Sequence, residues 1–310
     1  MPQNPNLDRA RDHRAALCVI SNPQLSLAVA PDVGAGIVWL RSMKDGHITW
    51  RWLREAQPEE KTTTSNLGCF LLAPFSNRIA FAKFNWMGQE RSLLDAPMMG
   101  QHAIHGNVWT AAWDVIEHAP EAVELAIDKN GTDWPWAFQA RVRYSLVEKG
   151  VRARLSLRNQ SNTAMPSGLG FHPYFPVSDD VTLQADVAAM VTNSSLMLPE
   201  KLSFDAPSVT RLRQGAVLPM GLDNGFARWS GKATICWTAA NKALQIETEP
   251  QAKWAVLYTP VGRDFFCFEP VTHQTNAHNM SLEGVSDTGL IALPPGHEQE
   301  ITMIMSLKVQ

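Results

Sequence analysis

Apolar and polar residues alternate with a period of two across the middle of the chain, which restricts this segment to β-strands. The alternation runs from 139 to 146, pauses at the polar turn Glu148-Lys149-Gly150 and resumes from 151 to 158. Such a pattern predicts a β-hairpin with one apolar face and one solvated face. The arginines at its polar positions are then most simply the solvated side of a sheet rather than an anion-binding site.

The same alternation recurs in shorter segments, each bounded by the glycine, proline, asparagine or aspartate residues that are typical of turns. These segments are Leu25–Val29, Val123–Ile127, Leu244–Ile246 and Ile301–Val309. No long segment shows the 3.6-residue period of an amphipathic helix, and only Arg51–Lys61 is expected to hold a short one. Many short strands separated by turns predict an all-β protein, either a sandwich or a barrel.

The chain has 310 residues, which is enough for one large β domain or two smaller ones. Hydrophobic residues make up 45% and charged residues 18%, which is the composition of an ordinary folded protein. No internal repeat, low-complexity tract or Pro/Gly/Ser-rich linker divides the sequence. We therefore expect a single domain over 17–310, preceded by a loose N-terminal leader over 1–16.

The charge balance argues against several classes of protein. The net charge is −3, and no run of five like charges occurs, so the clustered basic surface of a nucleic-acid-binding protein is not expected. Residues 1–14 lack the apolar core of a signal peptide, and no stretch of 18 apolar residues predicts a membrane-spanning helix. We expect a cytoplasmic protein with neither nucleic-acid nor membrane partners.

The four cysteines are widely spaced and include no Cys-x-x-Cys pair. This spacing predicts buried thiols in a reducing compartment rather than a disulfide framework or a zinc site. They are Cys18, Cys69, Cys236 and Cys267.

Two short segments each present one residue suited to proton transfer. His172 lies in His172-Pro173-Tyr174-Phe175, and Glu269 follows the apolar run Phe265–Phe268. Near pH 7 an imidazole can give a proton and a glutamate can take one, particularly when burial at the end of a strand raises the pKa of the carboxyl group. Taken alone, the histidine is more often a structurally satisfied turn residue, and the glutamate can simply be a strand-end group bonded to backbone amides.

Three further polar segments accompany this pair in a fixed order: Asn77-Arg78-Ile79, Ile104-His105-Gly106 and Leu222–Phe226, which contains Asp223. With His172-Pro173-Tyr174-Phe175 and Glu269-Pro270, this series resembles the aldose 1-epimerase (galactose mutarotase) family from about Leu25 to the C-terminus. The resemblance implies a large antiparallel β-sandwich of the galactose mutarotase type (a supersandwich), a small-molecule sugar substrate and no cofactor or metal.

The resemblance also implies roles for individual residues. Glu269 is the base that takes the anomeric proton, and His172 is the acid that protonates the ring oxygen. His105 is implied to contact the substrate, and Asn77 and Arg78 to bond sugar hydroxyls through their amide and guanidinium groups. Asp223 matches an acceptor for sugar hydroxyls, although Asp-Asn-Gly is also an everyday turn sequence. The implied activity is interconversion of the α and β anomers of a free aldohexose.

Alternatives remain open at this point. His102, His105 and His172 are conceivable metal ligands, but no local carboxylate completes a set. A hexose-6-phosphate 1-epimerase would need two or more basic groups on the phosphate. Arg78 alone does not meet that need, and the sequence does not place Arg211, Arg213 or Lys253.

A non-catalytic carbohydrate-binding sandwich is a third possibility, because fold does not prove function. Trp109, Trp134 and Trp136 could stack on a pyranose, although such tryptophans are more often simply core or loop anchors. Pro176 and the segment 271–275 depart from better-known galactose mutarotases, which puts the sugar in doubt more than the reaction. The oligomeric state, monomer or homodimer, is not determined by the sequence.

Overall fold

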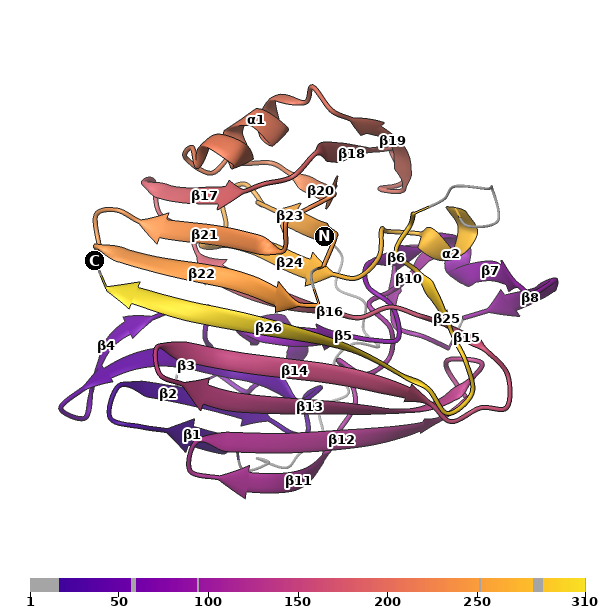
Figure 1. The fold of residues 1–310 in the computed structure, drawn as a ribbon, viewed down its shortest axis with the longest axis horizontal. Coiled ribbons are helices and arrows are strands. Elements are labelled where there is room, and N and C mark those ends of the chain that lie inside the picture. Colours follow the sequence, from indigo (N-terminus) through magenta and orange to yellow (C-terminus); the bar gives the residue numbers. More distant parts are fainter. Residues whose placement is uncertain (1–16, 57–59, 94, 251, 281–286, 310) are drawn as a thin grey trace.

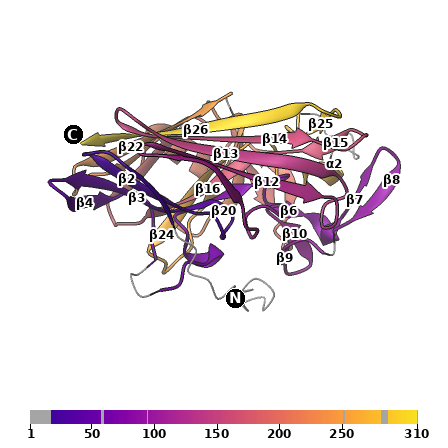
Figure 2. The same cartoon turned by 90° about the horizontal axis from the view of Figure 1, so that it is seen from below.

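The computed structural model describes residues 17–56, 60–93, 95–250, 252–280 and 287–309. Two large antiparallel sheets lie one over the other as two layers (Figures 1 and 2). The predicted all-β antiparallel sandwich is confirmed. The segment predicted to be a leader, 1–16, lies outside the described residues, and the division into leader and single domain stays a prediction.

The first sheet has eleven strands and carries the candidate site. Its order is β1 (Cys18–Ser21), β2 (Leu25–Ala30), β3 (Gly36–Lys44), β5 (Cys69–Leu72), β16 (Gly170–Pro176), β24 (Phe265–Val271), β23 (Trp254–Tyr258), β20 (Asp223–Ala227), β18 (Ala189–Asn193) and β19 (Pro199–Ser203), with β4 (His47–Arg51) paired to β3.

The second sheet has eight strands, which form the upper layer in Figure 2. Its order is β11 (Asp114–Ala119), β12 (Ala122–Asn130), β13 (Ala137–Val147), β14 (Gly150–Asn159), β26 (Glu298–Val309), β22 (Lys242–Glu249), β21 (Lys232–Trp237) and β17 (Val181–Ala185).

Smaller elements complete the described chain. They are the three-stranded sheet β6 (Arg78–Ile79), β10 (His102–Ile104) and β9 (Met98–Met99), the pairs β15 (Met165–Ser167) with β25 (Ile291–Leu293) and β7 (Lys83–Trp86) with β8 (Gln89–Ser92), the 3₁₀ turns η1 (Thr64–Asn66) and η2 (Ala80–Ala82), and the helices α1 (Pro207–Gln214) and α2 (Ala277–Met280). Within the described ranges no helix is long and apolar enough to cross a membrane.

The predicted hairpin is β13–β14, in which Val147 pairs with Gly150 across the turn. Its apolar positions are buried. Its arginines face solvent, where Arg143 and Arg154 form ion pairs with Glu124 and Glu300 on neighbouring strands. Such exposed pairs contribute at most about 1 kcal/mol each. The other predicted strands are confirmed as parts of β2, β12, β22 and β26.

The short helix expected over 51–61 is wrong for the described part of that segment, because Arg51 ends β4 and 52–56 are extended or irregular. Tertiary contacts override the local pattern here. Trp52 and Leu53 are buried in the core, and the Trp52 and Arg54 backbone N–H groups donate to the carbonyl oxygens of Leu40 and Tyr174. Those N–H groups are therefore not available to an i to i−4 helical ladder.

All four cysteines are free thiols, as expected. Cys18, Cys69 and Cys267 are buried, but Cys236 is only half-buried, which corrects the prediction that all four are buried. Cys236 lies on β21, a strand of the second sheet that alternates inward and outward residues.

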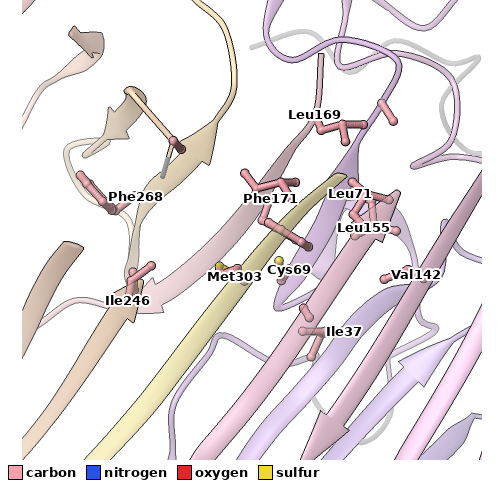
Figure 3. Close-up of a cluster of buried hydrophobic side chains, with 14 of the residues drawn as sticks. Ile37, Cys69, Leu71, Val142, Leu155, Leu169, Phe171, Ile246, Phe268 and Met303 are labelled. Carbon is pink, nitrogen blue, oxygen red and sulfur yellow. The ribbon is translucent and has the colours of Figure 1, made fainter. Parts of the chain in front are cut away.

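The main hydrophobic core fills the space between the two sheets. Figure 3 shows Leu71 and Phe171 from the first sheet beside Val142, Leu155 and Met303 from the second. Each of these side chains is fully buried. Because successive residues of a strand point to opposite faces, the residues between these core positions lie on the other face of the first sheet.

A second apolar cluster covers that other face. It includes Phe70, Trp109, Trp254, Val256 and Val271. The first sheet is therefore buried on both sides at its centre, and polar side chains held between these apolar residues are largely removed from water.

Gly106 lets the loop after β10 approach the end of β5. It has φ +73°, and a Cβ atom there would lie 1.9 Å from the carbonyl oxygen of Ala73. Asn77 and His105, which face each other across this junction, also have left-handed φ values of 55° and 60°. Strain of this kind persists only where surrounding structure holds it in place.

We expect Gly106→Ala to lower the free energy of unfolding by more than about 3 kcal/mol, because the backbone of residues 73–77 must move. Gly100→Ala is the matched control. Gly100 has φ +62° but open space around its Cβ position, so this variant should lose only about 1 kcal/mol. Urea denaturation measures both. Equal losses would contradict the close approach as the reason for this glycine.

Candidate active site

The register of β16 against β24 places His172 opposite Glu269. Gly170 pairs with Val271 and Tyr174 pairs with Cys267, so the residues midway between them face each other. The two residues are 97 positions apart in the chain and yet lie on adjacent strands. Phe171 and Phe268, their neighbours in sequence, point into the core between the sheets.

The two functional groups are in contact. His172 Nε2 lies 3.2 Å from Glu269 Oε1. His172 is 6% exposed and Glu269 is 2% exposed, so water screens the pair very little. Within the described residues, neither His172 Nδ1 nor Glu269 Oε2 has a hydrogen-bond partner. The second carboxylate oxygen is therefore free to accept a proton from a ligand.

Burial moves the pKa values of the two groups in opposite directions. Desolvation raises the pKa of Glu269 well above its usual range, and the charge of Asp223 adds to this while that of Arg78 opposes it. Desolvation also lowers the pKa of His172 well below its usual range, reinforced by His105 and Arg54. Each charged form is disfavoured, so at rest the pair is better described as a hydrogen-bonded couple sharing a proton than as a separated ion pair.

Two aromatic rings pack against the imidazole of His172. Phe70, its partner on β5, stacks on it at 4.3 Å between ring centres. Tyr174, two residues further along β16, stacks on it at 4.8 Å with an interplanar angle of 18°. The two rings also contact each other, with 6.0 Å between their centres. Together they restrict the orientation of the imidazole beside Glu269.

His105 lies edge-on to His172, with 5.2 Å between ring centres. Its Nδ1 accepts the backbone N–H of Asn77 at 3.2 Å, so its proton is on Nε2. Burial, with a smaller effect from Arg78, lowers the pKa of His105 to about 3. His105 is therefore neutral near pH 7 and presents an N–H donor, which suits contact with a sugar oxygen.

Arg78 is fixed at the polar side of the site by several groups. The Asn77 side-chain oxygen accepts both the Arg78 backbone N–H at 2.9 Å and the Arg78 Nη1–H at 3.1 Å. Arg78 Nη2 lies 3.4 Å from Asp223 Oδ2. Because this contact is long and partly exposed, sugar hydroxyls can replace it as hydrogen-bond partners of both Arg78 and Asp223.

A pocket adjoins the pair. Asn77, Arg78 and Asp223 form its polar side, and Trp254 and Val256 contribute an apolar wall. Its other lining residues are Val191, Asn193, Met197, Gly225, Ala255, Val271, His273, Gln274 and Thr275.

His172 and Glu269 do not line this pocket themselves. Glu269 lies one strand away from Val256, with which it pairs. The pair is nearly sealed from water and lies beside the pocket, not in its wall.

All six predicted site residues thus gather in one region, and the roles given to them stay predictions. The three candidate tryptophans take the more common role of such residues, as anchors of the protein's own apolar clusters. Trp134 and Trp136 are buried in the core beside Phe84, whereas Trp109 stacks on Phe70 at 5.0 Å. The tryptophan that lines the pocket is Trp254, which the sequence analysis did not single out.

The basic residues that a phosphate site would need do not line the pocket. Arg211 and Arg213 lie on α1, where Arg213 faces Asp186 at 3.6 Å, and Lys253 is exposed. Arg78 is the one lysine or arginine among the pocket-lining residues.

The imidazoles of His102 and His105 already have partners. Their Nδ1 atoms accept the backbone N–H groups of Phe81 at 3.0 Å and of Asn77 at 3.2 Å. In the described part of the chain no cluster of three histidine, cysteine or acidic residues has the geometry to hold a metal.

His273 supports the segment that carries Asn77. Its Nε2 accepts the backbone N–H of Ser76 at 3.0 Å, and its Nδ1–H donates to the Gln274 carbonyl oxygen at 2.7 Å. Burial lowers the pKa of His273 from 6.5 to about 4. Sequence reasoning did not find this residue, because its role depends on a contact 197 positions away.

We predict a measurable acid sensitivity from His273. Its folded-state pKa is depressed, so the unfolded chain takes up the proton first and stability is lost as pH falls from about 6.5 to about 4. His273→Gln should reduce the pH dependence of the unfolding free energy between pH 6 and 4.5 by about 1.4 kcal/mol per pH unit, one proton's worth. Urea denaturation at several pH values measures it. The exposed His118→Gln is the control, and an unchanged slope in His273→Gln would contradict the prediction.

Comparison with known proteins agrees with this arrangement. The family model described as aldose 1-epimerase matches residues 16–306. The chain therefore belongs to the aldose 1-epimerase family.

Among curated proteins of Escherichia coli K12, the uncharacterized protein YphB is 29% identical over 264 residues, 82% of this chain and 88% of YphB. The uncharacterized protein YihR is 24% identical over 236 residues, 73% of this chain and 76% of YihR.

Solved structures show the same fold. An E. coli K12 protein provisionally assigned as an aldose 1-epimerase superposes with a TM-score of 0.84 and 27% identity, covering 95% of this chain and 99% of the other. A galactose mutarotase-like protein from Clostridium acetobutylicum has a TM-score of 0.83 and 20% identity, covering 94% and 95% of the two chains.

Proposed function

We propose that this protein is an aldose 1-epimerase that interconverts the α and β anomers of a free aldohexose. The observation that carries the proposal is the buried contact between His172 Nε2 and Glu269 Oε1 beside a pocket with polar and apolar walls. Family membership supports the same reaction class.

In the proposed reaction, Glu269 takes the proton of the anomeric hydroxyl while His172 Nε2–H gives a proton to the ring oxygen. The bond between C1 and the ring oxygen breaks, and the C1–O1 bond becomes the carbonyl of the open aldehyde. Rotation about C1–C2 then presents the other carbonyl face. The ring oxygen attacks C1 while His172 recovers its proton and Glu269 returns the other, which gives the opposite anomer.

This cycle moves two protons and leaves the net charge of the site unchanged at every stage. That property suits a pair removed from water, where a net charge would be costly. The rate should depend on the form of the pair that holds one shared proton. The limits of its pH profile then belong to the pair and not to either residue alone.

The pocket chemistry favours an uncharged sugar. Arg78 and Asp223 in its lining offer donors and acceptors for hydroxyl groups, and Trp254 with Val256 offers an apolar face to the ring carbons. The Nε2–H of His105, outside the lining, adds a donor beside His172. With one cation in the lining, and that cation already facing Asp223, a phosphate dianion would meet little compensating charge.

We predict that Glu269→Gln keeps the fold and sugar binding but loses about 10²- to 10⁴-fold in rate, the usual contribution of a positioned general base. Polarimetry of freshly dissolved α-anomers of several aldoses measures the rate, and circular dichroism confirms the fold. The exposed Glu121→Gln is the control and should keep wild-type activity. Near wild-type mutarotation in Glu269→Gln would remove Glu269 from the mechanism.

We also predict that free aldoses are better substrates than their 6-phosphates, with a KM that barely changes between low and moderate salt. Hydroxyl contacts are little screened by ions, whereas charge-assisted bonds to a partly exposed phosphate weaken as salt is added. Initial rates at two ionic strengths test this. A higher kcat/KM for the 6-phosphate that fades with added salt would show that the site was built for phosphorylated sugars.

A further inference from the structure

A series of ring contacts that includes the imidazole of His172 ends in a cation. Trp109 stacks on Phe70, and Phe70 and Tyr174 both stack on His172 and contact each other. The guanidinium carbon of Arg54 lies 3.7 Å from the centre of the Tyr174 ring. The same guanidinium lies 4.7 Å from the centre of the Phe265 ring.

Arg54 is held in this position by main-chain contacts. Its backbone N–H donates to the carbonyl oxygen of Tyr174 at 2.8 Å, which ties it to β16 itself. Its Nη2–H donates to the carbonyl oxygen of Leu67 at 2.9 Å. The guanidinium therefore cannot leave the Tyr174 ring without breaking its hydrogen bond to the Leu67 carbonyl oxygen.

Unlike Arg41 and Arg51, Arg54 has no carboxylate partner within the described residues. The adjacent Glu55 forms ion pairs with Arg41 and Arg51 instead. The Nε of Arg54 is buried without a hydrogen-bond partner. Because no carboxylate neutralises this half-buried cation, its charge acts more strongly on the groups beyond the Tyr174 ring than the charge of an ion-paired arginine would.

Resting on the function proposed above, we propose that Arg54 is a positioning residue for His172. It clamps the Tyr174 ring that packs against the imidazole, and its unpaired charge acts on the His172–Glu269 pair. The clamp fixes the plane of the imidazole so that Nε2 faces Glu269. The charge disfavours a second proton on the pair and favours loss of the last one, which makes the imidazolium a stronger acid toward the ring oxygen.

Other charged or titratable groups face the pair from every side. His105 comes from the loop after β10, Tyr174 from β16 and Cys267 from β24, two residues before Glu269 on the same face of the sheet. Arg78 and Asp223 act on Glu269 from the pocket side. Arg54 acts in the same direction as His105 in lowering the pKa of His172. Among the residues that the structure describes, only Arg54 combines a permanent charge with direct stacking on the Tyr174 ring, which packs against His172.

The test compares Arg54→Gln, which removes the charge and the planar cation, with Arg54→Lys, which keeps the charge and loses the planar fork. The first readout is the pH titration of the His172 ring by NMR, which does not depend on activity. The second is the pH profile of mutarotation. Arg91→Gln is the matched control, because Arg91 also covers an aromatic ring, that of Trp136 at 5.1 Å, on a strand outside the site.

For Arg54→Gln we expect both limits of the pH profile, and the His172 titration, to move upward together by about one pH unit, since loss of a nearby positive charge favours every protonation step. Arg54→Lys should leave the limits in place but lower kcat several-fold. Arg91→Gln should change neither. Loss of activity in Arg54→Gln with unmoved limits and an unmoved titration would make Arg54 merely structural and overturn the proposal.

Two further outcomes keep the inference separate from the proposed function. If the wild-type protein does not interconvert anomers, the function fails, and the NMR titration of His172 still decides the role of Arg54. If Arg54→Gln does not fold, Arg54→Lys provides the test. An unchanged kcat in that variant would contradict the positioning role of Arg54.

Discussion

The antiparallel register between β16 and β24 is the constraint on which the candidate site depends. Phe171 and Phe175 on one strand and Phe266 and Phe268 on the other are all buried in the core between the sheets. A slip of one residue in either strand would drive that strand's aromatic side chains out of the core, so the register is strongly specified. With the phenylalanines directed inward, His172 and Glu269 must meet on the opposite face.

Removal from water then determines the electrostatics of that face. Phe70 and Tyr174 pack against the imidazole, and Trp254, Val256 and Val271 cover the neighbouring strands. The same desolvation disfavours the carboxylate form of Glu269 and the protonated forms of the histidines. The result is an uncharged His172–Glu269 pair able to exchange protons in both directions, which suits the proton transfers proposed above.

Some of the residues that would bind the sugar come from a different part of the fold, where the backbone is strained. Gly106 packs against Ala73, His273 supports Ser76, and the left-handed Asn77 and His105 bond to each other. Asp223, in contrast, lies on a strand of the same sheet as the acid and base. The surroundings of the pair are therefore placed partly by the regular sheet and partly by irregular segments.

The sequence by itself determined the β-architecture. In segments such as 139–158 the apolar residues alternate with a period of two, and they share one face only if the segment is a β-strand. It also supplied the six candidate site residues, because their short motifs resemble those of a known family. It misjudged 51–61, where contacts of Trp52, Leu53 and Arg54 with distant strands override local preference.

The sequence did not indicate Trp254, His273 or Arg54 either, because nothing in their local patterns marks them. Their roles arise from contacts with residues far away in the chain. Only the tertiary structure decided which groups surround His172 and Glu269, since desolvation, stacking and unpaired charge are properties of positions in space.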